Sequence, residues 1–284
     1  MGAAAFFDLD KTVIAKASMV AFGRPLYKEG LIARRTLARG LYGQLVYMHL
    51  GASEEKLTRI REMLLTLTRG WDQARVRAIV RETLDEVVEP IIYAEALELI
   101  EEHKAAGRKV YIVSASPEEI VLPLAEYLGV DEAIASRAKV DEEGKYTGEM
   151  ERYAYGPFKA EAMREAAASE GIDLSQSYAY SDSYTDAPML EVVGHPVAVN
   201  PDRVLLKLAR EKGWEVRTFA RPVRLRDRMP VPDRNQALAG VGALVAGAGL
   251  AAWWRLAHRR TPSPSGWQRV TRPATSLPRR LRGR

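Results

Sequence analysis

The stretch Ala3-Ala-Ala-Phe-Phe-Asp-Leu-Asp-Lys-Thr12 decides the fold of this chain. Its apolar first half is too short for a helix before Asp8, so we predict a buried strand that ends where the acids begin. In an open parallel sheet, ligands bind beyond the carboxyl ends of the strands. Asp8 and Asp10 are therefore candidates for a functional site.

Further apolar runs predict three more strands, at Lys109–Val113, Ser177–Tyr180 and Pro196–Val199. Helical segments such as Phe158–Glu170 separate them, and strands that alternate with helices indicate an α/β fold with a parallel sheet. Val140–Tyr146 is typical of a hairpin that turns at Gly144.

A second acidic pair, Asp182 and Asp186, follows the third predicted strand. Carboxylates that share one site repel each other unless a cation or a shared proton compensates. Carboxylate, carbonyl and water oxygens suit Mg²⁺. The two pairs therefore predict a magnesium site at the carboxyl edge of the sheet.

Polar residues between the two acidic pairs suit an anion. Ser114 and Ser116 end the second strand, before a helix whose N-terminal N–H groups favour negative charge. Lys159 opens the helix after Gly156-Pro-Phe158 and adds a positive charge. Taken one at a time, the serines and the second acidic pair could equally be helix caps, and Lys159 an ordinary surface lysine.

This order of motifs, strand-DxDxT, strand-Ser, Lys and strand-DxxxD, resembles the haloacid dehalogenase superfamily over about residues 3–217. The strings Asp8-Leu-Asp-Lys-Thr12, Ser114-Ala-Ser116 and Tyr180-Ser-Asp-Ser-Tyr-Thr-Asp-Ala-Pro-Met-Leu190 are most similar to its IB subgroup of phosphoserine phosphatase-like enzymes. The resemblance implies a Rossmann-like parallel sheet and a helical type I cap inserted between the first two motifs.

The resemblance also implies catalytic roles. Asp8 would be the nucleophile that forms an aspartyl-phosphate, and Asp10 the general acid that later activates water. Ser114 would hold the phosphoryl oxygens and Lys159 would neutralise their charge. Thr12 would fix the first loop through its hydroxyl and so contribute to phosphate binding.

The metal ligands implied by the resemblance come from both acidic pairs. Asp8, the backbone carbonyl of Asp10, and Asp182 would hold Mg²⁺, while Asp186 would support the metal or its waters and orient Lys159. The dehalogenases and P-type ATPases of the superfamily lack an acid at the position of Asp10. That acid therefore favours phosphoester hydrolysis.

The substrate is less defined than the chemistry. Phosphoserine phosphatases similar to this chain carry a glutamate nine residues after the nucleophile, where this chain has Ala17. The residue that would contact the substrate amine is therefore missing at that position. A type I cap excludes bulky groups, so we expect a small phosphorylated metabolite. A macromolecular or lipid-linked phosphate is the alternative, because an apolar run near the C-terminus indicates a membrane anchor.

We predict the following division of the chain. A catalytic core comprises residues 1–16 and 90–220, and a helical cap comprises residues 17–89, because that block, with a helix start at Ser53, is too large for one crossover helix. Residues 221–236 would form a basic linker that contains prolines, residues 237–254 an apolar helix, and residues 255–284 a disordered basic tail.

Charge is divided unevenly along the chain. Residues 1–200 carry 23 Lys and Arg against 32 Asp and Glu, whereas residues 201–284 carry 19 against 5. The absence of cysteine excludes disulfides, thiolate metal sites and cysteine nucleophiles. The acids so close to the start argue against a secretory signal, so we expect the catalytic part in the cytoplasm.

The uncharged run 237–254 is the feature that indicates a membrane. As a helix it would span about 27 Å, close to the hydrocarbon thickness of a bilayer, with Trp253 and Trp254 in an interfacial belt. We expect a transmembrane anchor, of undecided orientation, whose Arg-rich tail contacts anionic lipids. A buried helix or flexible linker is the alternative. A stripe of small residues suits pairing into a homo-oligomer: Ala239, Ala243, Gly247 and Ala251.

Together these observations predict a Mg²⁺-dependent phosphomonoester hydrolase. One alternative is a phosphotransferase with the same intermediate. A second is a membrane-anchored regulatory protein on the same scaffold, although every catalytic position is filled. A third, a nucleic-acid binder that uses the Arg-rich tail, is one we do not expect.

Overall fold

A computed structural model of the chain describes residues 2–33 and 62–221. The predicted helix start at Ser53, the linker beyond Arg221, the apolar run and the basic tail lie outside these residues. In the described part of the chain, no helix is both long enough and apolar enough to cross a membrane.

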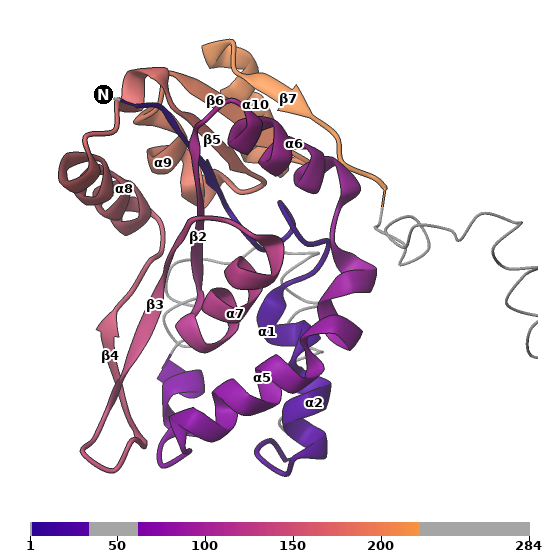
Figure 1. Cartoon of the computed structure of the whole chain (residues 1–284), viewed down its shortest axis with the longest axis vertical. Coiled ribbons are helices and arrows are strands. Elements are labelled where there is room, and N and C mark those ends of the chain that lie inside the picture. Colours follow the sequence, from indigo (N-terminus) through magenta and orange to yellow (C-terminus); the bar gives the residue numbers. More distant parts are fainter. Residues whose placement is uncertain (1, 34–61, 222–284) are drawn as a thin grey trace, which may run out of the picture. The chain divides into compact units, whose positions relative to one another are not determined.

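The described residues form one sheet of seven strands in the order β4-β3-β2-β1-β5-β6-β7 (Figure 1). All neighbouring strands are parallel except β3 and β4. The prediction of an α/β fold with a mostly parallel sheet is confirmed. The strands are β1 (Ala4–Phe7), β2 (Lys109–Pro117), β3 (Glu132–Val140), β4 (Tyr146–Arg152), β5 (Tyr178–Ser181), β6 (His195–Val199) and β7 (Glu215–Arg217).

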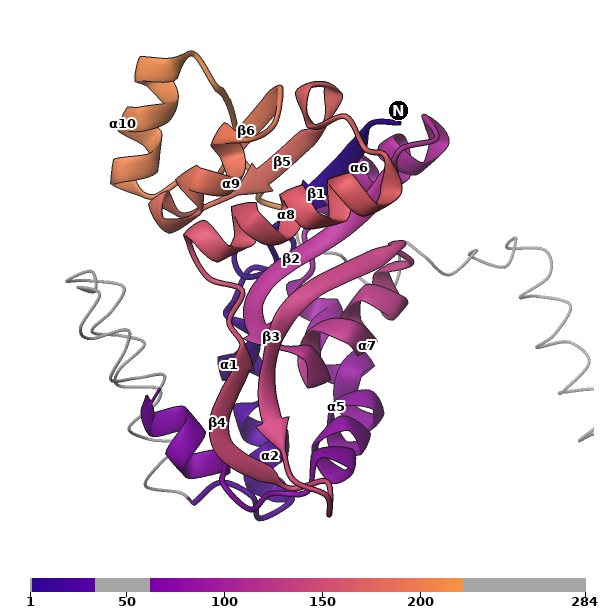
Figure 2. The ribbon, with the colours of Figure 1, turned by 90° about the vertical axis from the view of Figure 1, so that its left-hand side faces the viewer.

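Side chains of β1 alternate between the two faces of the sheet, as strand geometry requires. Ala5 and Phe7 pack with α6 and α7, whereas Ala4 and Phe6 pack with α8, α9 and α10. Figure 2 shows β1 enclosed between these two helical layers. The helices are α6 (Ala94–Ala105), α7 (Glu118–Leu128), α8 (Pro157–Glu170), α9 (Ala187–Glu191) and α10 (Arg203–Lys212), with short 3₁₀ turns η2 (Leu174–Gln176) and η3 (Tyr184–Asp186).

A further group of helices lies beyond the carboxyl ends of β1 and β2 (Figures 1 and 2). It contains α1 (Ser18–Ala21), α2 (Gly23–Lys28), α5 (Gln73–Val88) and the 3₁₀ turn η1 (Glu89–Ile91). The chain enters and leaves this group through two adjacent segments, because Ala15 N donates to Ile91 O over 2.7 Å and Tyr93 N to Val13 O over 3.0 Å.

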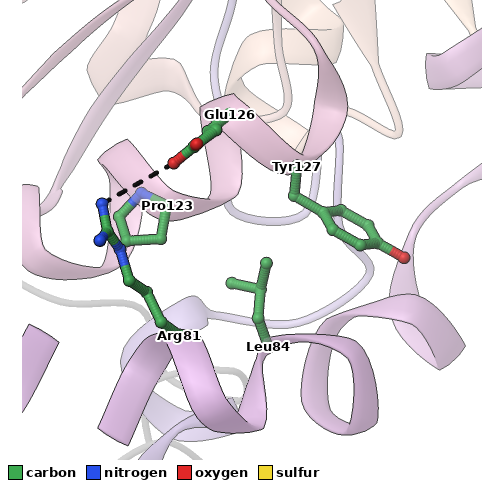
Figure 3. A pocket seen from close by; sticks show the side chains of 5 residues that line it. All are labelled: Arg81, Leu84, Pro123, Glu126 and Tyr127. Atoms are coloured by element: carbon green, nitrogen blue, oxygen red, sulfur yellow. Dashed lines mark ion pairs between the residues drawn. The ribbon is translucent and has the colours of Figure 1, made fainter. Parts of the chain in front are cut away.

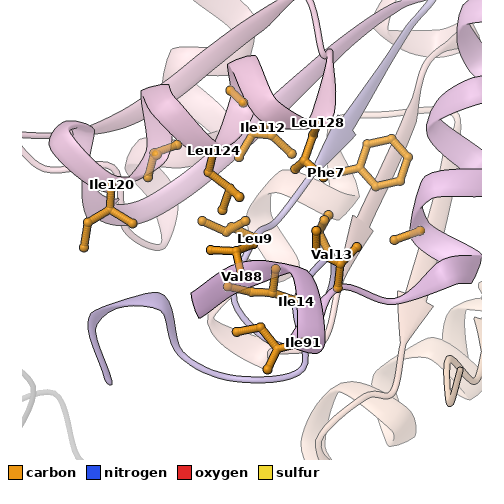
Figure 4. Packing of buried hydrophobic residues seen from close by; sticks show 14 of the residues in the cluster. Phe7, Leu9, Val13, Ile14, Val88, Ile91, Ile112, Ile120, Leu124 and Leu128 are labelled. Atoms are coloured by element: carbon orange, nitrogen blue, oxygen red, sulfur yellow. The ribbon is translucent and has the colours of Figure 1, made fainter. Parts of the chain in front are cut away.

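One apolar cluster joins these helices to the sheet (Figure 4). Val88 and Ile91 lie next to Leu9 and Ile14 of the first loop, with Leu124 of α7 above them. Burial of such side chains contributes roughly 1.5–3 kcal/mol each to folding. This packing fixes the position of the loop that carries Asp8 and Asp10.

The hairpin of β3 and β4 is longer than the sequence predicts. Gly144 lies in its turn with φ +76°, where a glycine is favoured. The tip contacts the segment before α5, since Gly70 N donates to Tyr146 O and Tyr146 N to Trp71 O. The full length of the two strands could not be predicted, because only some residues of each strand are buried and the apolar pattern is therefore incomplete.

Candidate active site

The site forms where β1 and β5 end side by side. Asp8 directly follows β1, and its N–H donates to Tyr180 O of β5 over 2.9 Å, which continues the pairing of the two strands. Asp182 directly follows β5 and Asp186 ends η3. The central position of β1 between β2 and β5 thus brings the predicted motifs to one edge of the sheet.

Lys159 connects the two acidic motifs. Its Nζ donates to Asp8 Oδ1 over 2.6 Å and to Asp186 Oδ2 over 2.7 Å. All three side chains are buried, with exposed fractions of 3%, 8% and 4%. Ser181 Oγ donates to the same oxygen of Asp186 over 2.8 Å. Lys159 is therefore an internal ammonium held by two carboxylates, not a surface lysine.

Negative charge exceeds positive charge in this cluster. Burial raises the pKa of Asp8 well above its usual value, and three neighbouring acids raise it further while Lys159 opposes them. Burial also raises the pKa of Asp182 to about 7, although Lys11 lowers it. Burial alone would lower the pKa of Lys159, but Asp186 and Asp8 outweigh it and raise that pKa. The cluster therefore favours an additional cation.

Asp10 points into a different set of contacts. Its Oδ1 accepts from Ser18 N over 2.9 Å and its Oδ2 accepts from Ser116 Oγ over 3.1 Å. Burial raises the pKa of Asp10, whereas these hydrogen bonds lower it. Ser18 was missed by the sequence reasoning, because only the fold brings it within reach of Ser116.

Ser114 lies in the final part of β2, which extends to Pro117. Its side chain is buried, and its Oγ accepts from Ser116 N over 3.1 Å. A hydroxyl that accepts one hydrogen bond can still donate its own proton, so Ser114 is able to donate to an incoming anion.

The first loop is fixed by its backbone rather than by Thr12. Val13 N and Ile14 N both donate to Leu9 O, over 3.0 and 3.1 Å. Thr12 Oγ1 is buried and makes no hydrogen bond to any described residue. The prediction that its hydroxyl fixes the loop is therefore wrong, and the buried oxygen is left for other partners.

The helix-cap alternatives are also wrong. α7 begins after Pro117 with no side-chain cap, so neither Ser114 nor Ser116 caps it. Asp186 precedes α9 but makes no capping bond there, because Oδ2 is engaged by Lys159 and Ser181.

Asp202 supports the second acidic motif and was not predicted. Its N–H donates to Asp182 O over 2.8 Å, and its Oδ2 accepts from Tyr184 N over 2.9 Å. Its Oδ1 caps α10 by accepting from Val204 N and Leu205 N. One side chain thus ties the Asp182 loop to the start of a helix.

The carboxylates of the site form a donor set for Mg²⁺. In the described residues, no three His, Asp or Glu side chains converge closely enough to form a metal cluster alone. Lys159 engages one oxygen of Asp8 and one of Asp186, whereas both oxygens of Asp10 accept from Ser18 N and Ser116 Oγ. Asp8 and Asp182 directly follow the neighbouring strands β1 and β5, so their carboxylates are the side-chain ligands that we assign. Two hard carboxylates in a cluster of excess negative charge fit a Mg²⁺ that keeps several waters.

A surface pocket of about 320 Å³ lies elsewhere, between α5 and α7 (Figure 3). An ion pair of Arg81 with Glu126 spans it, with 3.8 Å between the charged atoms. Its remaining lining residues are Leu84, Pro123 and Tyr127. None of the predicted site residues lines this pocket.

Comparison with known proteins gives the family. The haloacid dehalogenase-like hydrolase family matches residues 5–191. An "inhibition of morphological differentiation protein" of Streptomyces azureus is 54% identical over 90% of this chain and 94% of that protein. A probable phosphatase of Mycobacterium tuberculosis is 52% identical over 86% of both chains, and a phosphoserine phosphatase of that organism is 37% identical over 86% and 79%.

A solved structure agrees with this assignment. A Bordetella pertussis protein of unknown function superposes with a TM-score of 0.66 at 28% identity, over 76% of this chain and 98% of that one. The motif order at the carboxyl edge of the sheet and these relatives lead to one conclusion. The chain belongs to the haloacid dehalogenase-like hydrolases and is a phosphatase of their phosphoserine phosphatase-like branch.

Proposed function

We propose that this protein is a Mg²⁺-dependent phosphomonoester hydrolase that acts through an aspartyl-phosphate on a small phosphorylated metabolite. The observation that carries the proposal is the buried Lys159 between Asp8 and Asp186. A fixed ammonium beside a carboxylate at a strand end suits the negative charge that develops on a transferring phosphoryl group.

The proposed reaction has two steps. A carboxylate oxygen of Asp8 attacks phosphorus, the ester P–O bond breaks, and Asp10 gives its proton to the leaving oxygen. Asp10 then takes a proton from water as that water attacks the phosphorus of the aspartyl-phosphate. Inorganic phosphate leaves, and Asp8 is restored as a carboxylate.

Each remaining residue has a distinct task in the proposal. Ser114 donates its hydroxyl proton to a phosphoryl oxygen, and Lys159 balances the charge on the group. Asp186 holds Lys159 in place. Thr12, buried and without a described partner, is available to the phosphate end of the site. Bound Mg²⁺, held by Asp8, Asp182 and the carbonyl of Asp10, would supply Lewis-acid stabilisation of the phosphoryl oxygens.

The position of the helices supports a small substrate. α1, α2 and α5 lie beyond the carboxyl ends of β1 and β2, where a bulky phosphoester would have to enter (Figure 1). On this basis we propose that residues 17–89 act as a cap over the core of residues 1–16 and 90–220. Ala17 provides no charge for a substrate amine, so amine-free phosphoesters are the first candidates.

The test is phosphate release from a panel of phosphorylated metabolites with Mg²⁺. Wild type should release phosphate from at least one member, Asp8→Asn should be inactive, and a chelator should abolish the activity. Asp173→Asn changes a partly exposed acid that caps the turn η2, outside the site, and is the matched control. Activity that survives Asp8→Asn would contradict the nucleophile, and phosphorylated acceptor in place of phosphate would indicate a phosphotransferase.

A membrane anchor is a separate proposal that rests on the sequence of residues 237–254 and the basic residues around it. Full-length protein should co-sediment with vesicles that contain anionic lipid and resist extraction by salt. Release by salt alone would contradict an inserted helix and leave only an electrostatic attachment.

A further inference from the structure

Two serines from distant parts of the chain converge on the carboxylate of Asp10. Ser18 Oγ donates to Ser116 Oγ over 2.8 Å, and Ser116 Oγ donates to Asp10 Oδ2 over 3.1 Å. Ser18 N donates to the other oxygen, Oδ1, over 2.9 Å. Both serine side chains are buried, with residue exposures of 0% and 6%. These hydroxyls are therefore committed to one another and to Asp10.

This arrangement fixes the orientation of the Asp10 carboxyl group. In the described chain, Oδ1 and Oδ2 accept from two different groups, Ser18 N and Ser116 Oγ, and a carboxylate can accept about four hydrogen bonds. Each oxygen therefore keeps capacity for a proton or water, while rotation of the group would break a bond at both ends. A side chain that transfers a proton within a reaction depends on such fixed geometry.

The two serines come from elements with different surroundings. Ser116 ends β2, beside Ser114, which accepts its N–H. Ser18 is the first residue of α1, where the chain turns from the sheet into the helical group. The contact therefore joins the end of β2, the first loop and the start of the helices at one carboxylate.

We infer that Ser116, itself held by Ser18, is a positioning residue that aligns Asp10 for proton transfer to the leaving oxygen. The inference rests on the proposed function, because it assigns work to the acid of that reaction. It also explains a buried hydroxyl chain that neither caps a helix nor contacts Lys159.

The leaving group provides the test. An alkyl alkoxide needs a proton as it departs, whereas p-nitrophenolate departs without one. Ser116→Ala should lower kcat/KM for an alkyl phosphate about tenfold or more, and for p-nitrophenyl phosphate less than about threefold. Ser116→Thr keeps the hydroxyl and should restore the alkyl phosphate rate. Ser18→Ala should act in the same direction with a smaller effect.

Ser177→Ala is the matched control. Ser177 is buried too, but its hydroxyl bonds to Ala4 N and Asp173 O, outside the site. It should leave the ratio of the two kcat/KM values unchanged even if stability falls. Melting temperatures of all variants distinguish a loss of folding from a loss of Asp10 alignment. If Ser116→Ala does not fold, Ser18→Ala provides the test.

Two results would overturn the inference while leaving the proposed function intact. One is an equal loss on both substrates in Ser116→Ala, and the other is no loss on either, with Asp8→Asn inactive throughout. Wild type that releases phosphate from no monoester, or an active Asp8→Asn, would instead contradict the proposed function itself.

Discussion

Lys159 balances the charge of two buried carboxylates, and a substitution there leaves both of them without a partner. Breaking a buried ion pair by removing one member typically costs about 3–5 kcal/mol. We predict that Lys159→Met lowers the free energy of unfolding by about this amount and abolishes phosphatase activity. Urea denaturation at pH 7 measures the first effect and phosphate release the second.

Lys207→Met is the control for the loss of one positive charge. The Lys207 side chain is 80% exposed and pairs with Glu211 on the helix surface. Its substitution should change the free energy of unfolding by less than about 0.5 kcal/mol. Similar values for both variants would mean that Asp8 and Asp186 tolerate burial alone, which contradicts the prediction.

His103 is a second buried residue whose charge state is fixed by its surroundings. Arg108 Nε donates to its Nδ1 over 2.7 Å, so the ring proton lies on Nε2, 2.8 Å from the Tyr180 hydroxyl. Burial, with the charges of Arg108 and Arg217, lowers the pKa of His103 to about 4. The histidine is therefore neutral in the folded protein at physiological pH.

This depressed pKa predicts an acid-sensitive contribution to stability. The pKa of His103 in the unfolded chain is about 6.5. Below that pH the unfolded chain binds a proton at His103 and the folded chain does not, so the free energy of unfolding falls as the pH falls toward 4. The loss at pH 5 should be about 2 kcal/mol relative to pH 7. His103→Gln lacks this titration, so its urea midpoints at pH 5 and pH 7 should differ less than those of wild type. An equal divergence would assign the effect to other groups.

Two aspartates stabilise the N-termini of helices, and only one of them also contacts the candidate active site. Together they separate the effect of helix capping on stability from an effect on activity. Asp72 caps α5 through Arg75 N, and Asp202 caps α10 while also holding Tyr184 N. We predict that either substitution to alanine costs about 1 kcal/mol of stability. Only Asp202→Ala should lower activity and raise the Mg²⁺ concentration for half-maximal rate, because it alone removes the side-chain bond to Tyr184 N in the Asp182 loop.

Urea denaturation and Mg²⁺ titration of both variants check this pair. Asp202→Asn retains a capping oxygen and should recover most of the lost rate. An Asp202→Ala protein with the wild-type Mg²⁺ dependence would show that the loop keeps its shape without the aspartate.

The elements that carry the site were predictable because their signals are local. β1, β2, β5 and β6 are short apolar runs, and polar residues follow three of them at the edge that binds ligands. β7 is a three-residue edge strand with two charged residues, and nothing in that pattern distinguishes it from a loop.

Contacts between distant segments were not predictable. The acids and Lys159, by contrast, could be assigned to the site because the order of their motifs is visible in the sequence itself. The bond of Ser18 to Ser116 joins positions 98 apart, and it exists only because β2 ends beside the first loop. Asp202 was missed for the same reason, since its link to the Asp182 loop depends on how β6 aligns with β5.

At the scale of the whole molecule, charge separates the described unit from the rest of the chain. The compact unit that contains all described residues extends to Met229. Residues 1–229 hold 32 Lys and Arg against 36 Asp and Glu, and residues 230–284 hold 10 against 1. The net charge of +5 therefore reflects a segment outside the predicted site.

A protein that ends at Met229 should fold and retain activity on soluble substrates. Phe219 is buried and Arg221 O accepts from Ala94 N, so the last described residues are packed against the rest of the described chain. We predict cooperative unfolding, kcat/KM within about twofold of the full chain, and retention on an anion exchanger at pH 8. Aggregation or loss of activity would show that residues 230–284 are needed for the fold.

The buried ammonium between two carboxylates also has a consequence for protein chemistry. Acylating reagents attack only the uncharged amine of a lysine, and Lys159 is both 2% exposed and held in its charged form. It should therefore be the last described lysine to be labelled, and its labelling should require global opening. Peptide mass mapping of acetylated Lys159 would then serve as a footprint for unfolding, and a bound phosphate analogue should slow its appearance.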